Sequence, residues 1–162
     1  MVRRLSLLVV LATAFSVFAP LLVAPAHAAQ QVEYACIRRG PVSGDYVNVC
    51  ARLYRESARS YYAYGAMDGT NSEPRLYIDA LHLRYIRYGV EHVAARAQAK
   101  SGRDYINHRT VTVTFSEYTC EGGLEHARVF AIIGYHIIWQ NGQRTPATGQ
   151  ASVRTPWWTC GA

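Results

Sequence analysis

The chain has 162 residues, of which 50% are hydrophobic, 12% aromatic and 17% charged, with a formal net charge of +6. This length suits one domain with a modest core and excludes several large domains. No internal repeat, low-complexity tract or proline- or serine-rich linker divides the sequence. Lys100 is the single lysine, and the preference for arginine indicates GC-rich coding, as in a high-GC Gram-positive bacterium.

The first 28 residues have the pattern of a secretory signal peptide. Arg3 and Arg4 form a cationic start, Leu5–Val23 is almost wholly apolar, and residues 26–28 read Ala-His-Ala, the small-x-small site that signal peptidase cleaves. The apolar run raises the alternative of a membrane anchor, but two prolines interrupt it and no basic stop-transfer cluster follows. We therefore predict removal of residues 1–28, and a secreted, extracellular single domain at 29–162 without stable membrane insertion.

Four cysteines lie in this mature part, and an even number in an oxidising compartment predicts two disulfides. Three pairings are possible, and the spacing favours the two short-loop closures, Cys36–Cys50 and Cys120–Cys160. Each bond would stabilise the domain by about 2–4 kcal/mol. There is no C-x-x-C motif, and the wide spacings argue against thiolate ligation of a metal. No metal and no cofactor is therefore expected.

β-Branched and aromatic residues are common along the mature chain, and turn residues recur at short intervals, which is typical of strands. Alternation is clearest where Val111, Val113 and Phe115 point one way and three threonines (110, 112 and 114) point the other, toward solvent. The strands expected in chain order are Val32–Arg38, Tyr46–Arg55, Ser60–Ala66, Leu76–Tyr88, Asn107–Tyr118 and Ala127–Gln140. The last of these is apolar on both faces, which predicts a central strand.

Two further segments are less regular. Val90–Lys100 allows a helix, through its alanines, or a strand with residues 93, 95, 97 and 99 on one face; the strand is preferred because its neighbours are strands. After residue 140, Asn141-Gly142 predicts a hairpin. The returning strand starts at Gln143, is limited by Pro146 and continues through Gln150–Arg154.

About seven to eight short strands with turns between them predict an all-β fold. We expect an antiparallel β-sandwich, immunoglobulin-like, with a small barrel as the alternative and two disulfides in either case. Tyr118-Thr119-Cys120 is similar to the Tyr-x-Cys of an immunoglobulin strand, but the matching tryptophan after an earlier cysteine is missing. No family is assigned on that segment.

Arginine and tyrosine interleave in two stretches, Arg52–Tyr64 and Arg75–Tyr88. Arginine beside exposed aromatic rings binds anions and stacks on flat ring faces. Outside the cell, this composition indicates an anionic cell-wall polymer, a glycan or an extracellular protein as partner, and no nucleic acid. In Trp157-Trp158, one ring is expected to pack inward and the other to offer a sugar-stacking platform. The predicted contact residues are Arg52, Tyr54, Tyr62, Tyr64 and Trp158.

No catalytic constellation stands out. Adjacent strand residues point to opposite faces, so Glu91–His92 and Glu125–His126 cannot pair simply, and Asp79 and His82 fall on opposite faces of a regular strand. The motifs H-E-x-x-H, G-x-S-x-G and Ser-x-x-Lys are absent. Asp79 and Glu117 are the carboxylates placed on predicted strands, where a glycosidase would need a facing pair. No catalytic residue is assigned.

The sequence therefore predicts a secreted, non-enzymatic binding module for a cell-envelope polymer or another extracellular macromolecule. Two alternatives remain open. One is a secreted protease inhibitor that uses the loop Gly40–Asp45 or Asp68–Pro74, and the other is a small extracellular hydrolase that uses a carboxylate or histidine pair.

Overall fold

The computed structural model describes residues 29–40, 46–69, 74–97, 100–103, 107–114 and 127–161. The signal segment, Glu117, Cys120 and most of both candidate inhibitor loops lie outside the described residues. Within the described ranges every regular element is a β-strand, all strand pairs are antiparallel, and there is no helix. The all-β prediction is confirmed at this level.

One sheet has four strands in the order β1-β2-β3-β7. Their bounds are Gln30–Arg39 for β1, Val47–Arg55 for β2, Ser60–Gly69 for β3 and Asn107–Thr114 for β7. Along β2, alternate residues from Val47 to Leu53 are fully buried, and the residues between them reach the surface. This period of two makes one face of the sheet apolar and leaves the other face to polar and aromatic side chains.

The second sheet has seven strands, with β10-β8-β4-β5 as its main order and β6, β9 and β11 paired at its margins. The strands are β4 (Arg75–Arg87), β5 (Val90–Ala97), β6 (Lys100–Arg103), β8 (Arg128–Ile138), β9 (Arg144–Thr145), β10 (Ala151–Arg154) and β11 (Trp158–Thr159). The long strand β8 lies between β4 and β10, in agreement with its apolar character on both faces.

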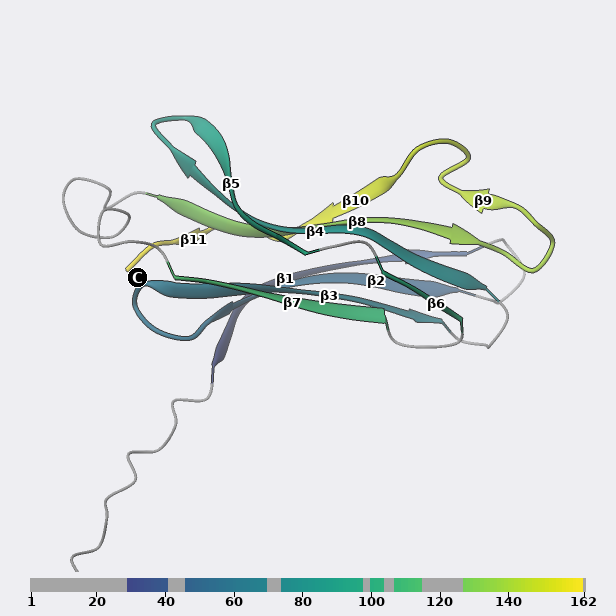
Figure 1. The fold of residues 1–162 in the computed structure, drawn as a ribbon, viewed down its shortest axis with the longest axis horizontal. Helices are drawn as coiled ribbons and strands as arrows, with labels where there is room; N and C mark the ends of the chain where they lie inside the picture. Colours follow the sequence, from purple (N-terminus) through teal and green to yellow (C-terminus); the bar gives the residue numbers. More distant parts are fainter. Residues whose placement is uncertain are drawn as a thin grey trace, which may run out of the picture.

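The two sheets lie in two layers (Figure 1), and buried residues of both form one hydrophobic cluster. At Gly65 of β3 the layers are close, because a Cβ built there would lie 2.9 Å from Ile133 Cδ1 of β8. The largest fully buried side chains in the cluster are Tyr61, Leu53 and Met67 from the four-stranded sheet, and Tyr135, Leu76, Ile78, Leu81, Leu83, Ile133 and Ile137 from the other.

The structure confirms the expected hairpin and corrects two details of the strands. Gly142, with a φ of 82°, donates its N–H to the Trp139 carbonyl in the turn that leads into β9. β3 runs on through Gly69, beyond the expected end of this strand at Ala66. Val90–Ala97 is a strand, but Leu83 pairs with Ala95 and Arg84 with Val93, so a bulge at Ala94 breaks the simple alternation.

A second bulge lies in β4, between Ile78 and Ala80. The buried positions change there from Leu76 and Ile78 to Leu81 and Leu83. The regular alternation that would separate Asp79 from His82 therefore does not hold, because one extra residue in the strand shifts the face of every residue after it.

The Cys36–Cys50 disulfide is present and joins directly opposite residues of β1 and β2, with 4.1 Å between their Cα atoms. Cys160 is buried at the end of β11, but Cys120 is outside the described residues. The second pairing, Cys120–Cys160, thus stays a prediction.

Candidate functional site

Four of the five predicted contact residues come together on the outer face of the four-stranded sheet. Arg52 lies opposite Tyr64 in the β2–β3 register, and Tyr54 lies opposite Tyr62. All four are half-buried on the outer face, and the residues that alternate with them on both strands point into the core. We call these four residues the Arg/Tyr patch.

The rings of the patch contact one another. The Tyr54 and Tyr62 rings stack with their centroids 4.8 Å apart and 4° between their planes. Tyr64 meets Tyr54 edge-on, at 6.3 Å and 80°. Because Tyr54 and Tyr62 each turn one face toward the other, that pair offers fewer flat faces than the sequence suggested, and more ring edges and hydroxyl groups.

Two phenols of the patch, those of Tyr62 and Tyr64, have a raised pKa. Burial raises the pKa of Tyr62, and the neighbouring Tyr54 and Glu56 raise it further. Burial also raises the pKa of Tyr64, and Tyr54 adds to this, whereas the positive charge of Arg52 acts in the opposite direction. Since an ordinary phenol already titrates near pH 10, both hydroxyls remain hydrogen-bond donors at neutral pH.

A hollow of about 450 Å³ adjoins the patch and shares Arg52 and Tyr64 with it. The Arg52 guanidinium carbon lies 5.8 Å from the centre of the Tyr64 ring. Among the residues that the structure describes, neither Arg52 nor Asp68 has a partner of opposite charge. The lining residues are Cys36, Asn48, Cys50, Arg52, Tyr64, Ala66 and Asp68.

The fifth predicted contact residue is elsewhere. Trp158 belongs to β11, which pairs with β8 of the seven-stranded sheet, and its ring packs against the hydrophobic core. Trp157 is the exposed member of the pair, at 48%, with the Arg128 guanidinium carbon 4.1 Å from the centre of its ring. The structure therefore does not bring Trp158 to the patch; its ring is half-buried against the core, and its role in ligand contact stays a prediction.

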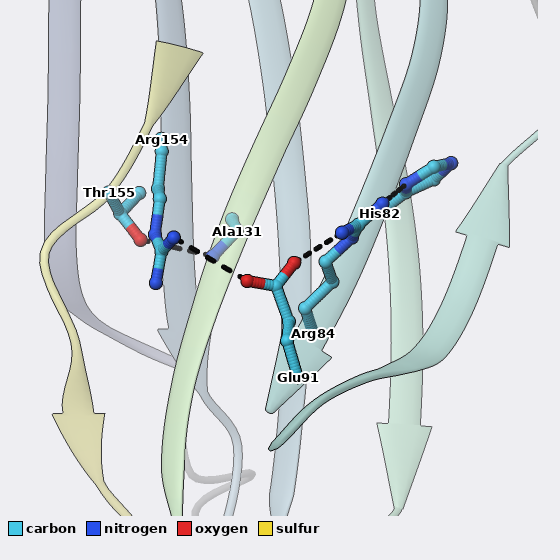
Figure 2. A network of polar contacts seen from close by, with 6 residues as sticks. All are labelled: His82, Arg84, Glu91, Ala131, Arg154 and Thr155. Carbon is cyan, nitrogen blue, oxygen red and sulfur yellow. Dashed lines mark hydrogen bonds and ion pairs between the residues drawn. The ribbon is translucent and has the colours of Figure 1, made fainter. Parts of the chain in front are cut away.

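The second arginine–tyrosine stretch is on β4, where a carboxylate of the neighbouring strand pairs with one of its arginines, Arg84. Figure 2 shows Glu91 between two arginines: one carboxylate oxygen binds Arg84, and the other lies 3.5 Å from Arg154. Arg84 also contacts His82 Nδ1 at 3.1 Å, and the Arg154 guanidinium carbon lies 3.7 Å from the centre of the Phe130 ring. These cations are engaged within their own sheet.

An Asp79–His136 pair on the same sheet was missed from the sequence. Both carboxylate oxygens of Asp79 lie 2.8 Å from His136 Nδ1, and the Tyr77 ring stacks on the imidazole at 4.2 Å. The two residues are 57 positions apart, so the β4–β8 register alone could have revealed them. An oriented imidazole can act as a base, but no hydroxyl or thiol of the described residues is hydrogen-bonded to it.

Other observations of the described residues are negative. No group of three or more histidine, cysteine, aspartate or glutamate side chains in these ranges is arranged to hold a metal ion. Nor do they include a helix of the length and apolar character that a membrane crossing requires. No protein-family model matches the sequence, and no curated protein matches it. The patch and the hollow are therefore the features of the described residues that bear on function.

Proposed function

We propose that the protein is a secreted, non-enzymatic β-sandwich with two disulfides that binds an anionic cell-envelope polymer outside the cell. The Arg/Tyr patch is its contact surface. The observation that carries the proposal is the contact of these four side chains across two strands. One of them, the guanidinium of Arg52, is not neutralised by any described carboxylate.

The chemistry of the patch fits an anionic, hydroxyl-rich ligand. A guanidinium presents several donors to a carboxylate or phosphate. Neutral phenols donate to and accept from hydroxyl groups. The patch also lies on paired strands rather than on a loop, so its side chains meet a ligand with little loss of backbone freedom.

Strands β1 and β7 flank the two strands of the patch. The β3–β7 register places Thr110 opposite Tyr64 and Thr112 opposite Tyr62. On the other side, Tyr34 of β1 lies opposite Arg52 and is 63% exposed. A polymer that crosses the four strands would therefore meet the patch in the middle of its path.

The direct test is co-sedimentation of the secreted protein with isolated cell walls and insoluble glycans at low and high salt. We expect retention that weakens as salt rises, because salt screens the attraction of Arg52 for an anion. Retention unaffected by salt would assign the contact to the tyrosines. No retention on any wall or glycan would refute the proposal.

A double variant tests the site. Tyr62→Ala with Tyr64→Ala should abolish retention and leave the circular dichroism spectrum and the unfolding transition in place. Tyr88→Ala is the matched control, since Tyr88 is 80% exposed on the β4–β5 turn of the other sheet. If the double variant unfolds, the two tyrosines belong to the core and the site is misassigned.

A further inference from the structure

We propose that the hollow beside the Arg/Tyr patch is a subsite for one carboxylated sugar residue, of the uronic acid type, within the bound polymer. This inference rests on the proposed function and adds the chemical class of the ligand. The hollow has an apolar floor and two polar ends of different charge.

The floor is short and apolar. Cys36, Cys50 and Ala66 are opposite one another on β1, β2 and β3, so a disulfide and a methyl group form one cross-strand row. Larger polar side chains stand on both sides of this row. A pyranose ring has an apolar face formed by its C–H groups, and such a floor suits that face. The volume of about 450 Å³ falls in the usual range of small-molecule sites.

One end of the hollow is cationic. Arg52 lies beside the Tyr64 ring and has no described carboxylate partner. A guanidinium binds a carboxylate through two parallel hydrogen bonds, which fixes the orientation as well as the charge of the ligand. A neutral sugar would leave this donor set unused.

The other end binds hydroxyl groups. Asn48 and Asp68 are opposite each other in the β2–β3 register, and both line the hollow. A carboxylate accepts hydrogen bonds from hydroxyls, and an amide both donates and accepts. Asp68 would repel an anion at this end, so the negative charge of the ligand belongs at Arg52 and its hydroxyl groups at Asp68.

The two ends of the hollow are separated along β2. Asn48 and Arg52 are four residues apart, which separates their Cα atoms by about 13 Å at the usual strand rise. A sugar ring on the floor would turn its carboxylate toward Arg52 and its hydroxyls toward Asp68.

The test measures binding of the secreted protein to a galacturonic acid trimer by calorimetry. The comparison ligands are the same trimer with its carboxylates methyl-esterified and a glycerol phosphate polymer. We expect esterification and Arg52→Gln each to weaken binding at least tenfold. Arg87→Gln, which removes an equal charge from the seven-stranded sheet, should leave the affinity unchanged.

Asp68→Asn separates recognition from simple charge attraction. If Asp68 accepts hydroxyls, this variant should bind the trimer about fivefold or more weakly. If the hollow merely attracts anions, the loss of a negative charge should strengthen binding instead, and the inference is overturned.

The wall assay separates this inference from the proposed function. Retention on walls without a preference for the free-acid trimer over its ester would overturn the uronic acid subsite and leave the binding module in place. Competition by the phosphate polymer alone would overturn it in the same way. Loss of both wall and trimer binding would remove both proposals.

Discussion

The outer faces of the two sheets carry similar residues and use them differently. On the seven-stranded sheet, Glu91 lies between Arg84 and Arg154, and Asp79 binds His136. On the four-stranded sheet, Arg52 has no partner of opposite charge among the described residues. A charge that has a neighbour within the fold contributes to stability, up to about 1 kcal/mol when exposed. A charge without one is available to an external ligand.

The two arginine–tyrosine stretches have similar composition, and both alternate along strands. The sequence placed the predicted contact residues in the first stretch, at Arg52, Tyr54, Tyr62 and Tyr64, together with Trp158. The register of the strands distinguishes the two stretches. The bulge in β5 accompanies the placement of Glu91 beside Arg84. No acidic residue of β1 or β3 is opposite Arg52. The following three changes test the contrast.

The largest effect is expected from Cys36→Ala with Cys50→Ala. The bond closes a loop of sequence separation 14, and loss of such a constraint on the unfolded chain should lower the free energy of unfolding by about 2–4 kcal/mol. The variant also removes the floor of the hollow, so binding to the uronic acid trimer should fall. Urea unfolding of both proteins measures the first effect. An unchanged urea midpoint would mean that the pairing of β1 with β2 holds the two strands in register without the disulfide.

A smaller effect is expected from Glu91→Gln. The change leaves Arg84 and Arg154 without their carboxylate, and the free energy of unfolding should fall by about 1 kcal/mol. Retention on cell walls should not change. Asp68→Asn is the matched carboxylate-to-amide change on the other sheet, and its effect on stability should stay within about 0.5 kcal/mol. Equal losses in the two variants would contradict the contrast between the faces.

The smallest effect concerns pH and His82. Burial lowers the pKa of His82, and the nearby charges of Arg84 and Arg96 lower it further. The folded protein therefore binds fewer protons at this residue than the unfolded chain, whose histidine titrates near pH 6.5. This contribution to stability is fully present above that pH and is lost as the pH falls through 6.5 toward the lower, folded-state value.

Urea midpoints at pH 8 and pH 5 measure this dependence. His82→Gln should reduce the difference between the two midpoints, because glutamine does not titrate. If the patch binds independently of the seven-stranded sheet, retention on cell walls should not change with the protonation of His82. An identical pH slope in both proteins would show that His82 is not coupled to folding.

Local alternation predicted the strands and the shared face of Arg52, Tyr54, Tyr62 and Tyr64, because these depend on residues near one another in the chain. The Cys36–Cys50 bond followed from short spacing. Three other features needed the pairing of distant strands: the bulges at Asp79 and Ala94, and the Asp79–His136 contact.

The two tryptophans show another limit of alternation. It predicts that adjacent rings point to opposite sides, but it does not decide which ring enters the core. In the structure Trp158 packs against the core and Trp157 is exposed. The pairing of β11 with β8 decides this, and Trp158 is 29 residues from its partner Val129.

The Cys36–Cys50 bond also bears on when the hollow can form. Its sulfur atoms line the hollow, and β1 is an edge strand with most of its residues exposed or half-exposed. Cytosolic thiols are kept reduced, so on the proposal that the protein is secreted, its precursor before export would lack this floor and hold β1 less firmly. Ligand binding would then be acquired only after translocation and oxidation, which would keep the unexported precursor from binding carboxylated sugars in the compartment where it is synthesised.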